Sequence, residues 1–323
     1  MKVLVTGVTG FVGSNLVDRL LNSGYHVKAI VRNPQLITNP DIEIIIGDIR
    51  DETTVNKAIQ DCQQVYHLAG VTSRTKSNSS DFWSINSEAT RLLGDFASKY
   101  NVQKFVYGST IGVYGITKSG ILTETSPTNP NTIYRQTKLA GETALLELHQ
   151  QQKLPLVIAR LTSMLGDNGR NWLGLVKALQ GKTFKFLGAG DNVYNVVHVQ
   201  DAVRALQLCG ESSAISNGQC YNIGHHYQTT FKEFVSLITE QLEIDFPAYN
   251  NFTLPFQACL TIDRLAQRYF NIGLPFAHRY EVFLTSRQID VNKAKKDLEF
   301  IAQLSPRQGV ADMINSLRSN GDL

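Results

Sequence analysis

Residues 3–13 read VLVTGVTGFVG, an apolar strand pattern that passes through three glycines into an amphipathic stretch. Gly7 permits a tight turn, Gly10 lets the backbone approach a phosphate, and Gly13 allows a helix to pack closely on the strand. The amino end of that helix favours negative charge. The spacing is one residue wider at its start than G-x-G-x-x-G, but the apolar run 27–31 supplies the next strand of a βαβ unit. The sequence therefore predicts a site for the pyrophosphate of a dinucleotide.

Length and composition predict a globular protein with a substantial core. The chain has 323 residues, of which 42% are hydrophobic and 18% charged. Its net charge of +3, without a basic tract interleaved with aromatics, favours no nucleic-acid partner. A strand pattern begins directly at residue 1, and no apolar run of about 18 residues follows. We therefore expect no membrane association and a cytoplasmic location.

Cysteine and histidine spacing predicts no metal site. Cys62, Cys209, Cys220 and Cys259 are scattered without C-x-x-C spacing, which argues against zinc and against a disulfide framework. The adjacent histidines at 225–226 are expected to point to opposite faces of an extended segment, without a further Cys or His nearby. A reducing compartment follows as the expectation.

Apolar runs alternate with helical patterns along the first half of the chain. Strands are expected at 3–5, 27–31, 42–46, 65–68, 105–107 and 156–158, and helices at 11–22, 52–60, 84–99 and 134–150. Later helices are expected at 199–209, 229–242, 256–270 and 306–318. This alternation predicts an α/β doubly wound parallel sheet with a smaller carboxyl-terminal α/β substrate lobe. We expect a dinucleotide-binding domain at 1–165, and at 166–323 mainly the substrate lobe, with parts returning to the first domain.

Ligands of an open α/β sheet bind beyond the carboxyl ends of its strands, so the residues there are candidates. After the second strand, Arg32 and Asn33 stand where a carboxylate would read the ribose of NAD. Arginine there favours a 2′-phosphate, so we expect NADP(H) over NAD(H), unless Arg32 is a solvated surface residue. After the third strand, Asp48 can accept from the adenine amino group or cap the helix near Glu52. After the fourth, the small residues at 68–70 let the backbone approach a cofactor.

A tyrosine four residues before a lysine is the strongest catalytic pattern. It occurs three times, at Tyr100/Lys104, Tyr114/Lys118 and Tyr134/Lys138. The first pair spans a helix end and a strand start, and the second lies in a loop broken by glycines. Only Tyr134 begins a convincing helix, after the helix-start signal at 129–132. Residues four apart share a helix face, so the Lys138 ammonium can favour the ionised Tyr134 phenol, which is a usable base.

In order along the chain, the glycine pattern, Asp48, Thr110, Tyr134 and Lys138 resemble the extended short-chain dehydrogenase/reductase family, the NAD-dependent epimerase/dehydratase group, with its Rossmann fold. The resemblance implies that Tyr134 is the general acid/base, that Lys138 holds the nicotinamide ribose, and that Thr110 bonds the substrate oxygen. It implies a cofactor site made of Gly7, Thr9, Gly10, Phe11, Val12, Gly13, Arg32, Asn33, Asp48, Ile49, Leu68, Ala69, Gly70, Tyr134, Lys138 and Leu161. A small-molecule substrate and a homodimer are expected.

The substrate is less closely defined by the sequence. Val113-Tyr114-Gly115 and the segment 125–134 are similar to nucleotide-sugar epimerases, dehydratases and ketoreductases. Ser163 stands where those enzymes typically carry an asparagine, and Tyr194 lies where an Arg-Asp pair is expected. The alternative is a reductase of a non-sugar ketone, similar to dihydroflavonol reductases or 3β-hydroxysteroid dehydrogenases. A third is an NADP(H)-binding sensor, which the retained Tyr134 disfavours. Candidate substrate-binding residues are Thr72, Ser109, Ser163, Tyr194 and Arg287.

Overall fold

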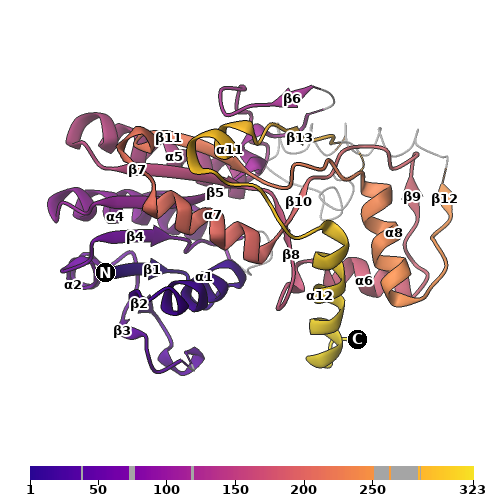
Figure 1. Ribbon diagram of the computed structural model, residues 1–323, viewed down its shortest axis with the longest axis horizontal. Helices are drawn as coiled ribbons and strands as arrows, with labels where there is room; N and C mark the ends of the chain where they lie inside the picture. Colours follow the sequence, from indigo (N-terminus) through magenta and orange to yellow (C-terminus); the bar gives the residue numbers. More distant parts are fainter. Residues whose placement is uncertain (38, 73–76, 118–119, 251–261, 263–282, 284) are drawn as a thin grey trace.

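The structure is a computed structural model that describes residues 1–37, 39–72, 77–117, 120–250, 262, 283 and 285–323. Within this part of the chain, a seven-stranded sheet has the order β11-β7-β5-β4-β1-β2-β3 (Figure 1). Its strands are β1 (Lys2–Thr6), β2 (His26–Val31), β3 (Glu43–Ile46), β4 (Gln64–His67), β5 (Lys104–Thr110), β7 (Leu156–Leu161) and β11 (Gln219–Ile223). Every neighbouring pair is parallel. The predicted doubly wound sheet is confirmed.

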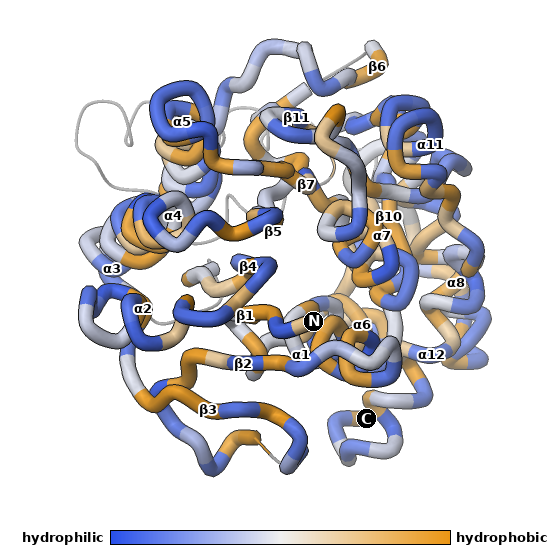
Figure 2. The backbone as a smooth tube through the Cα atoms, turned by 60° about the vertical axis from the view of Figure 1, so that its left-hand side comes forward, coloured by the Kyte–Doolittle hydropathy of each residue, from blue (hydrophilic) through white to orange (hydrophobic). Residues whose placement is uncertain are grey.

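Helices cover both faces of this sheet. Figure 2 shows α2 (Glu52–Ile59), α3 (Ser79–Trp83), α4 (Ala89–Lys99) and α5 (Ile133–Gln152) on one side, with α1 (Phe11–Asn22) and α7 (Val199–Glu211) on the other. Side chains alternate between the faces of a strand. Val106 of β5 therefore joins the core under α1 and α7, whereas Phe105 and Tyr107 join the core under α4 and α5. Burial on both faces explains the continuous apolar runs that predict these strands.

The remaining elements build the smaller part of the molecule and its connections. They are β6 (Ile121–Leu122), β8 (Ser163–Leu165), α6 (Leu173–Gln180), β9 (Phe186–Leu187), β10 (Val196–His198), α8 (Phe231–Leu242), β12 (Tyr249–Asn250), β13 (Gln288–Ile289), α11 (Asn292–Leu298) and α12 (Pro306–Ser319). Short 3-10 turns are η1 (Pro34–Leu36), η3 (Ile111–Tyr114), η4 (Arg170–Trp172) and η5 (Ala214–Ser216). A separate core rich in aromatic rings joins α6, α8 and α12. The smaller part of the molecule, built around this core, lies beyond the carboxyl ends of the main strands (Figure 1).

One strand was not expected at its position, and one expected helix is divided. The strand β11 is formed by residues after 166 but pairs with β7 at the edge of the main sheet. Its sequence, QCYNI, mixes polar with apolar residues and gives no clean apolar run. The helix expected at 84–99 is divided, because its first residues form a π-helical turn η2 (Ser84–Glu88) after α3, and α4 begins at Ala89. The helix expected at 256–270 lies outside the described residues, Ile262 excepted.

Candidate active site

The turn between β1 and α1 depends on glycine at two positions. Gly7 has a φ of +78°, and a Cβ there would lie 2.7 Å from the Ala69 nitrogen. A Cβ on Gly13 would overlap the Gly7 carbonyl oxygen. Gly10 is exposed at the N-cap of α1, so the first amides of the helix face outward beside exposed Thr9. This cradle at a helix amino end fits a pyrophosphate.

Three further residues of the expected cofactor site, on α1 and at the end of β7, share one apolar core. Phe11 and Val12 are half-buried in the first turn of α1 and pack against the core between α1 and α7. Leu161, at the end of β7, belongs to the same core and is 6% exposed. Their expected contacts with a bound dinucleotide stay predictions.

Charged residues gather beyond β2 and β3. Arg32 and Asn33 are exposed, and the Asn33 side chain accepts from the Gln35 amide at the start of η1. The Arg50 guanidinium donates to both oxygens of Asp48 at 3.0 and 2.8 Å. These bonds lower the pKa of Asp48, with a smaller contribution from the charge of Arg32. Asp48 does not cap α2.

The cap of α2 is Asp51, whose carboxylate accepts from the Thr54 amide at 2.8 Å. The alternative reading of Asp48 as a helix cap is therefore wrong. Ile49, between the two acids, is buried in the core under α2. Asp48 thus keeps its carboxylate at the carboxyl end of β3, half-buried and ionised beside two arginines.

The loop after β4 is held from two sides. The Thr6 hydroxyl contacts the His67 ring at 2.7 Å and accepts from the Ala69 amide at 3.1 Å. Asn86, buried in η2, bonds both backbone groups of Val71, accepting at 2.8 Å and donating at 3.0 Å. It also donates to the Thr137 hydroxyl of α5 at 3.1 Å.

Asn86 therefore ties the loop at 68–71 to α5. Sequence reasoning missed this residue, although an asparagine on the buried face of a helix was a usable signal. Leu68 and Ala69 are half-buried and Gly70 is exposed, so the backbone of this loop is open to a ligand. Thr72, the next candidate, is exposed.

Helix α5 begins where the sequence predicts. The Thr132 side chain caps it by accepting from the Arg135 amide, and Tyr134 is half-buried in its first turn. Lys138 is 4% exposed, with its Nζ 4.1 Å from the centre of the Tyr107 ring. Burial lowers the pKa of Lys138 to about 7, against the opposing effect of the Glu142 carboxylate. A buried ammonium of this kind is poised to bind a polar partner.

The end of β5 lies beside α5. The Thr110 side chain is half-buried and accepts from the Gly112 amide at 3.0 Å. A Cβ on Gly112 would come within 3.1 Å of the Arg135 side chain, so η3 packs against the first turn of α5. Ser109, a substrate-binding candidate, is 4% exposed and donates to Glu142 at 2.5 Å. Its hydroxyl therefore faces the interior between β5 and α5.

Of the other two tyrosine-lysine pairs, only Tyr100/Lys104 is described at both residues. Tyr100 is the C-cap of α4 and Lys104 is the first residue of β5, so the pair does not share a helix. Tyr114 is buried at the end of η3 and its partner Lys118 lies outside the described residues. Burial raises the pKa of Tyr114 to about 12. The sequence argument for Tyr134 agrees with these positions.

Candidate substrate residues of the second lobe are brought together in part. Ser163 and Tyr194 are half-buried, and their hydroxyls lie 2.8 Å apart. The Arg287 guanidinium donates to the Gly115 carbonyl at 2.9 and 3.2 Å. It therefore joins the β13 region to the loop after η3, while the backbone of Arg287 bridges Tyr194.

Comparison with known proteins gives the family. A model of the NAD dependent epimerase/dehydratase family matches residues 3–224, and the chain belongs to that family. It is an NAD-linked enzyme of the extended short-chain dehydrogenase/reductase type, as the resemblance predicted. The isoform 1 3β-hydroxysteroid-dehydrogenase/decarboxylase of Arabidopsis thaliana is 26% identical, with 97% of this chain and 79% of that protein covered.

Solved structures agree with this fold. MoeE5 in complex with UDP-glucose and NAD is 27% identical, with a TM-score of 0.79 and 99% of both chains covered. The UDP-glucuronic acid 4-epimerase of Bacillus cereus in complex with NAD is 24% identical, with a TM-score of 0.80 and 99% of both chains covered.

The expected preference for NADP(H) is wrong. The family is NAD-dependent, and the similar structures above contain NAD. The prediction considered the charge of Arg32 without the other charges that lie near it in the fold. In the fold, Arg32 is exposed, and its charge acts on the Asp48 carboxylate of the neighbouring loop, which is already paired with Arg50. An exposed arginine after β2 therefore does not by itself decide between the two cofactors.

Two further expectations can be compared with the described residues. In that part of the chain, no helix has the length and apolar character needed to cross a membrane. His225 and His226 do not point apart, because their rings stack with centres 4.3 Å apart. Among the same residues, no group of three or more His, Cys, Asp or Glu side chains could hold a metal ion.

Proposed function

We propose that this chain moves a hydride between NAD and a hydroxyl- or keto-bearing carbon of a nucleotide sugar, as an epimerase, dehydratase or 4-ketoreductase. The observation that carries the chemistry is buried Lys138, one helical turn from Tyr134 and over the Tyr107 ring of β5. When bound, the cofactor would accept the hydride in its oxidised form and donate it in its reduced form. The cradle at Gly7, Gly10 and Gly13 would hold its pyrophosphate.

The protein's own part in the reaction is to move one proton and to orient the substrate. Tyr134 would take the proton from the substrate hydroxyl on oxidation and return it on reduction. The Lys138 ammonium would bind the ribose and favour the ionised phenol, because opposite charges attract strongly in a buried site. The Thr110 hydroxyl would bond the substrate oxygen. Asp48, Ile49 and the loop at 68–70 would surround the adenosine.

The substrate class rests on the similarity to MoeE5, whose structure contains UDP-glucose. A specific observation favours a second candidate, the reduction of a non-sugar ketone. Ser163 and Tyr194 occupy two positions where nucleotide-sugar enzymes were expected to carry other residues, and they bond each other at 2.8 Å. Together they offer a neutral surface instead of a cation for a diphosphate. The similarity to a 3β-hydroxysteroid-dehydrogenase/decarboxylase supports this alternative.

Calorimetric titration with UDP and dTDP separates the two candidates. A nucleotide-sugar enzyme is expected to bind one of these diphosphates without the sugar, because much of the affinity comes from the nucleotide. The control is a titration with NAD, which shows that the protein is competent to bind. Absence of binding by both diphosphates, together with reduction of an apolar ketone, would establish the second candidate.

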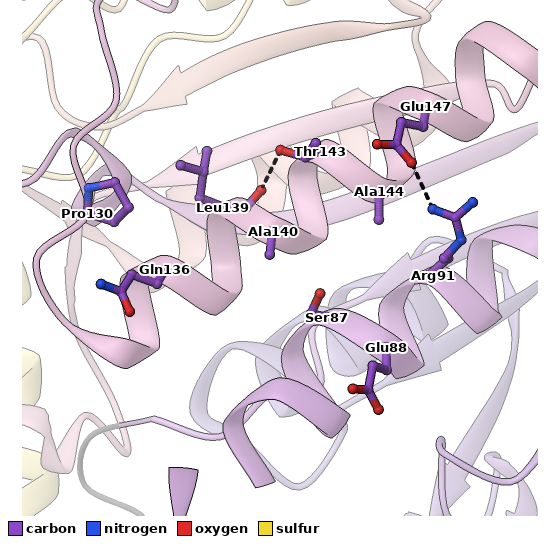
Figure 3. A pocket seen from close by; sticks show the side chains of 10 residues that line it. All are labelled: Ser87, Glu88, Arg91, Pro130, Gln136, Leu139, Ala140, Thr143, Ala144 and Glu147. Carbon is purple, nitrogen blue, oxygen red and sulfur yellow. Dashed lines mark hydrogen bonds and ion pairs between the residues drawn. The ribbon is translucent and has the colours of Figure 1, made fainter. Parts of the chain in front are cut away.

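We also propose a homodimer formed through the groove between η2, α4 and α5 (Figure 3). Its lining residues are Ser87, Glu88, Arg91, Pro130, Gln136, Leu139, Ala140, Thr143, Ala144 and Glu147. The small Ala140 and Ala144 allow another helix to approach closely, and the groove carries both charge signs, so it complements a second copy of itself.

Ala144→Arg is expected to convert the dimer to a monomer, because the long cation would occupy the groove. Light scattering after size-exclusion chromatography measures the mass. Ile215→Arg is the control, since Ile215 is 76% exposed on η5, outside this groove, and its change is expected to leave the dimer intact. A wild-type protein that is monomeric at high concentration would refute the dimer.

The division into domains and the cellular location stay proposals. We place the boundary between the dinucleotide-binding domain and the substrate lobe at 165–166, with β11 as a part of the later segment that returns. A reducing cytoplasm is supported by Cys62 and Cys209, which are free and buried. Burial raises the pKa of these thiols to about 11 and about 12.

A further inference from the structure

A buried ion pair lies next to the proposed catalytic helix and has no part in the chemistry described above. Glu142 of α5 is 1% exposed and Arg160 of β7 is 7% exposed. The Arg160 Nη2 donates to Glu142 Oε2 at 2.7 Å, and Nε donates to Oε1 at 3.1 Å. Two buried charges are costly to desolvate and add little stability over apolar residues. Their placement therefore invites a functional explanation.

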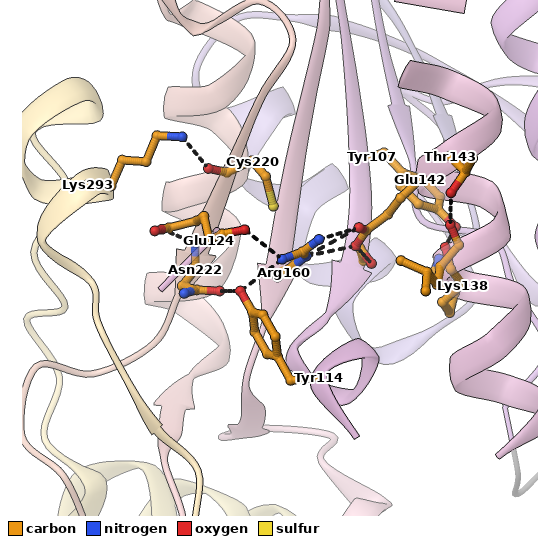
Figure 4. Close-up of polar contacts among 12 residues, drawn as sticks. Tyr107, Tyr114, Glu124, Lys138, Glu142, Thr143, Arg160, Cys220, Asn222 and Lys293 are labelled. Atoms are coloured by element: carbon orange, nitrogen blue, oxygen red, sulfur yellow. Dashed lines mark hydrogen bonds and ion pairs between the residues drawn. The ribbon is translucent and has the colours of Figure 1, made fainter. Parts of the chain in front are cut away.

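The pair connects three elements of the site. Ser109, directly before Thr110 on β5, donates to Glu142 Oε1 at 2.5 Å. On its other side, Arg160 donates to the Tyr114 hydroxyl at 2.9 Å and to the Glu124 carbonyl at 3.3 Å. Figure 4 shows Arg160 between Glu142 of α5 and the group around Tyr114. The position of α5 relative to the end of β5 is thus fixed through one carboxylate.

The same carboxylate is one helical turn after Lys138. Residues four apart share a helix face, and both side chains are buried. The titratable groups around Lys138 are Tyr134 and Glu142 on α5, His67 on β4, and Tyr107 on β5. Burial, and then the charge of Lys138, lowers the pKa of His67 to about 3, so His67 is neutral. Burial raises the pKa of Tyr107 far above its usual value, so it is neutral too.

Among these described neighbours, Glu142 is therefore the group that supplies a fixed negative charge to Lys138. We propose that Glu142 is a positioning residue that keeps Lys138 as an ammonium and holds α5 against the end of β5, with Arg160 limiting how strongly its charge acts on the lysine. This inference rests on the proposed role of Lys138 at the cofactor.

The test uses two variants with opposite expected signs. Glu142→Gln removes the negative charge, so Lys138 should lose its proton at lower pH, and tight NAD binding should end about one pH unit or more below the wild-type limit. Arg160→Met leaves the carboxylate unpaired beside Lys138, and the limit should move to higher pH. Calorimetric titration with NAD at a series of pH values measures the pH limit of NAD binding for both variants and requires no substrate. The pH profile of kcat/KM, once a substrate is known, should move in parallel.

Controls separate this role from a loss of structure. Glu240→Gln makes the same change in an exposed ion pair with Arg307 and should leave the profile unchanged. The double variant Glu142→Gln, Arg160→Met removes both charges, so it leaves no unpaired buried charge and should fold even if a single variant does not. Thermal unfolding shows whether each variant is folded. The limit of the double variant should also lie below the wild-type limit.

The inference would be overturned if the pH limit of NAD binding moved in the same direction in both single variants. It would also be overturned if that limit did not move in a folded Glu142→Gln protein or in the double variant. Lys138→Met distinguishes this failure from failure of the proposed function. If Lys138→Met leaves NAD affinity unchanged at every pH, Lys138 does not bind the cofactor and the underlying role is wrong. If it weakens NAD binding while Glu142→Gln has no effect, only the role of Glu142 is wrong.

Discussion

Tyr134→Phe is expected to lower turnover by roughly 100-fold or more, because it deletes the one hydroxyl that moves the substrate proton. A 100-fold loss corresponds to about 2.7 kcal/mol of transition-state stabilisation. The fold and the affinity for NAD should be nearly unchanged, since the ring remains half-buried in the first turn of α5. Steady-state kinetics and NAD titration on the same preparation measure both. Lys138→Met should weaken turnover and NAD binding together.

Tyr100→Phe is the matched control for this prediction. Tyr100 also precedes a lysine by four residues, but its hydroxyl donates to Asn56 at 2.8 Å. Tyr100 ends α4 shortly before the amino end of β5, whereas Thr110 is the last residue of that strand. Turnover of Tyr100→Phe should equal that of the wild type. Retention of most activity by Tyr134→Phe would show that another group moves the proton, and Tyr114 would be the next residue to test.

Gly13→Ala is expected to abolish measurable NAD binding and to destabilise the protein by about 3 kcal/mol or more. The added Cβ would overlap the Gly7 carbonyl oxygen, and this contact joins two backbones, so no side-chain rotation can relieve it. Relief requires α1 to move away from β1, which opens the turn that holds the pyrophosphate. Calorimetry with NAD and urea unfolding measure the two effects.

Gly174→Ala provides the control for the glycine change. Gly174 is exposed within α6, and no atom lies within 4 Å of the position of its added Cβ. Alanine in a helix should stabilise the protein slightly, by about 0.5–1 kcal/mol. A Gly13→Ala protein with wild-type stability and NAD affinity would mean that the turn is not shaped as described.

The local patterns of the sequence predicted much of this protein. The glycines at 7, 10 and 13 required a strand, a turn and a helix in succession, and α1 has the predicted bounds 11–22. The choice of Tyr134 among three similar pairs followed from the helix-start signal at 129–132. Both inferences use interactions within about ten residues, which a sequence displays directly.

The cofactor prediction failed because it rested on the charge of one exposed side chain, Arg32, taken without the charges near it in the fold. Arg32 and Asp48 belong to loops after different strands, and the parallel pairing of β2 with β3 brings their charges close together. Sequence spacing cannot show how one charge offsets the other, because the offset depends on their distance in the fold.

The sequence by itself determined the alternation of strands and helices, the phosphate-binding turn and the Tyr134-Lys138 helix, because each is encoded in short-range periodicity and backbone preference. The tertiary structure alone showed that β11 is the strand that returns to the main sheet, that Asn86 bridges the loop at 68–71 to α5, and that Glu142 pairs with Arg160. These features join segments distant in the chain. Their partners are chosen by which polar groups become buried together and must then satisfy each other's hydrogen bonds and charge.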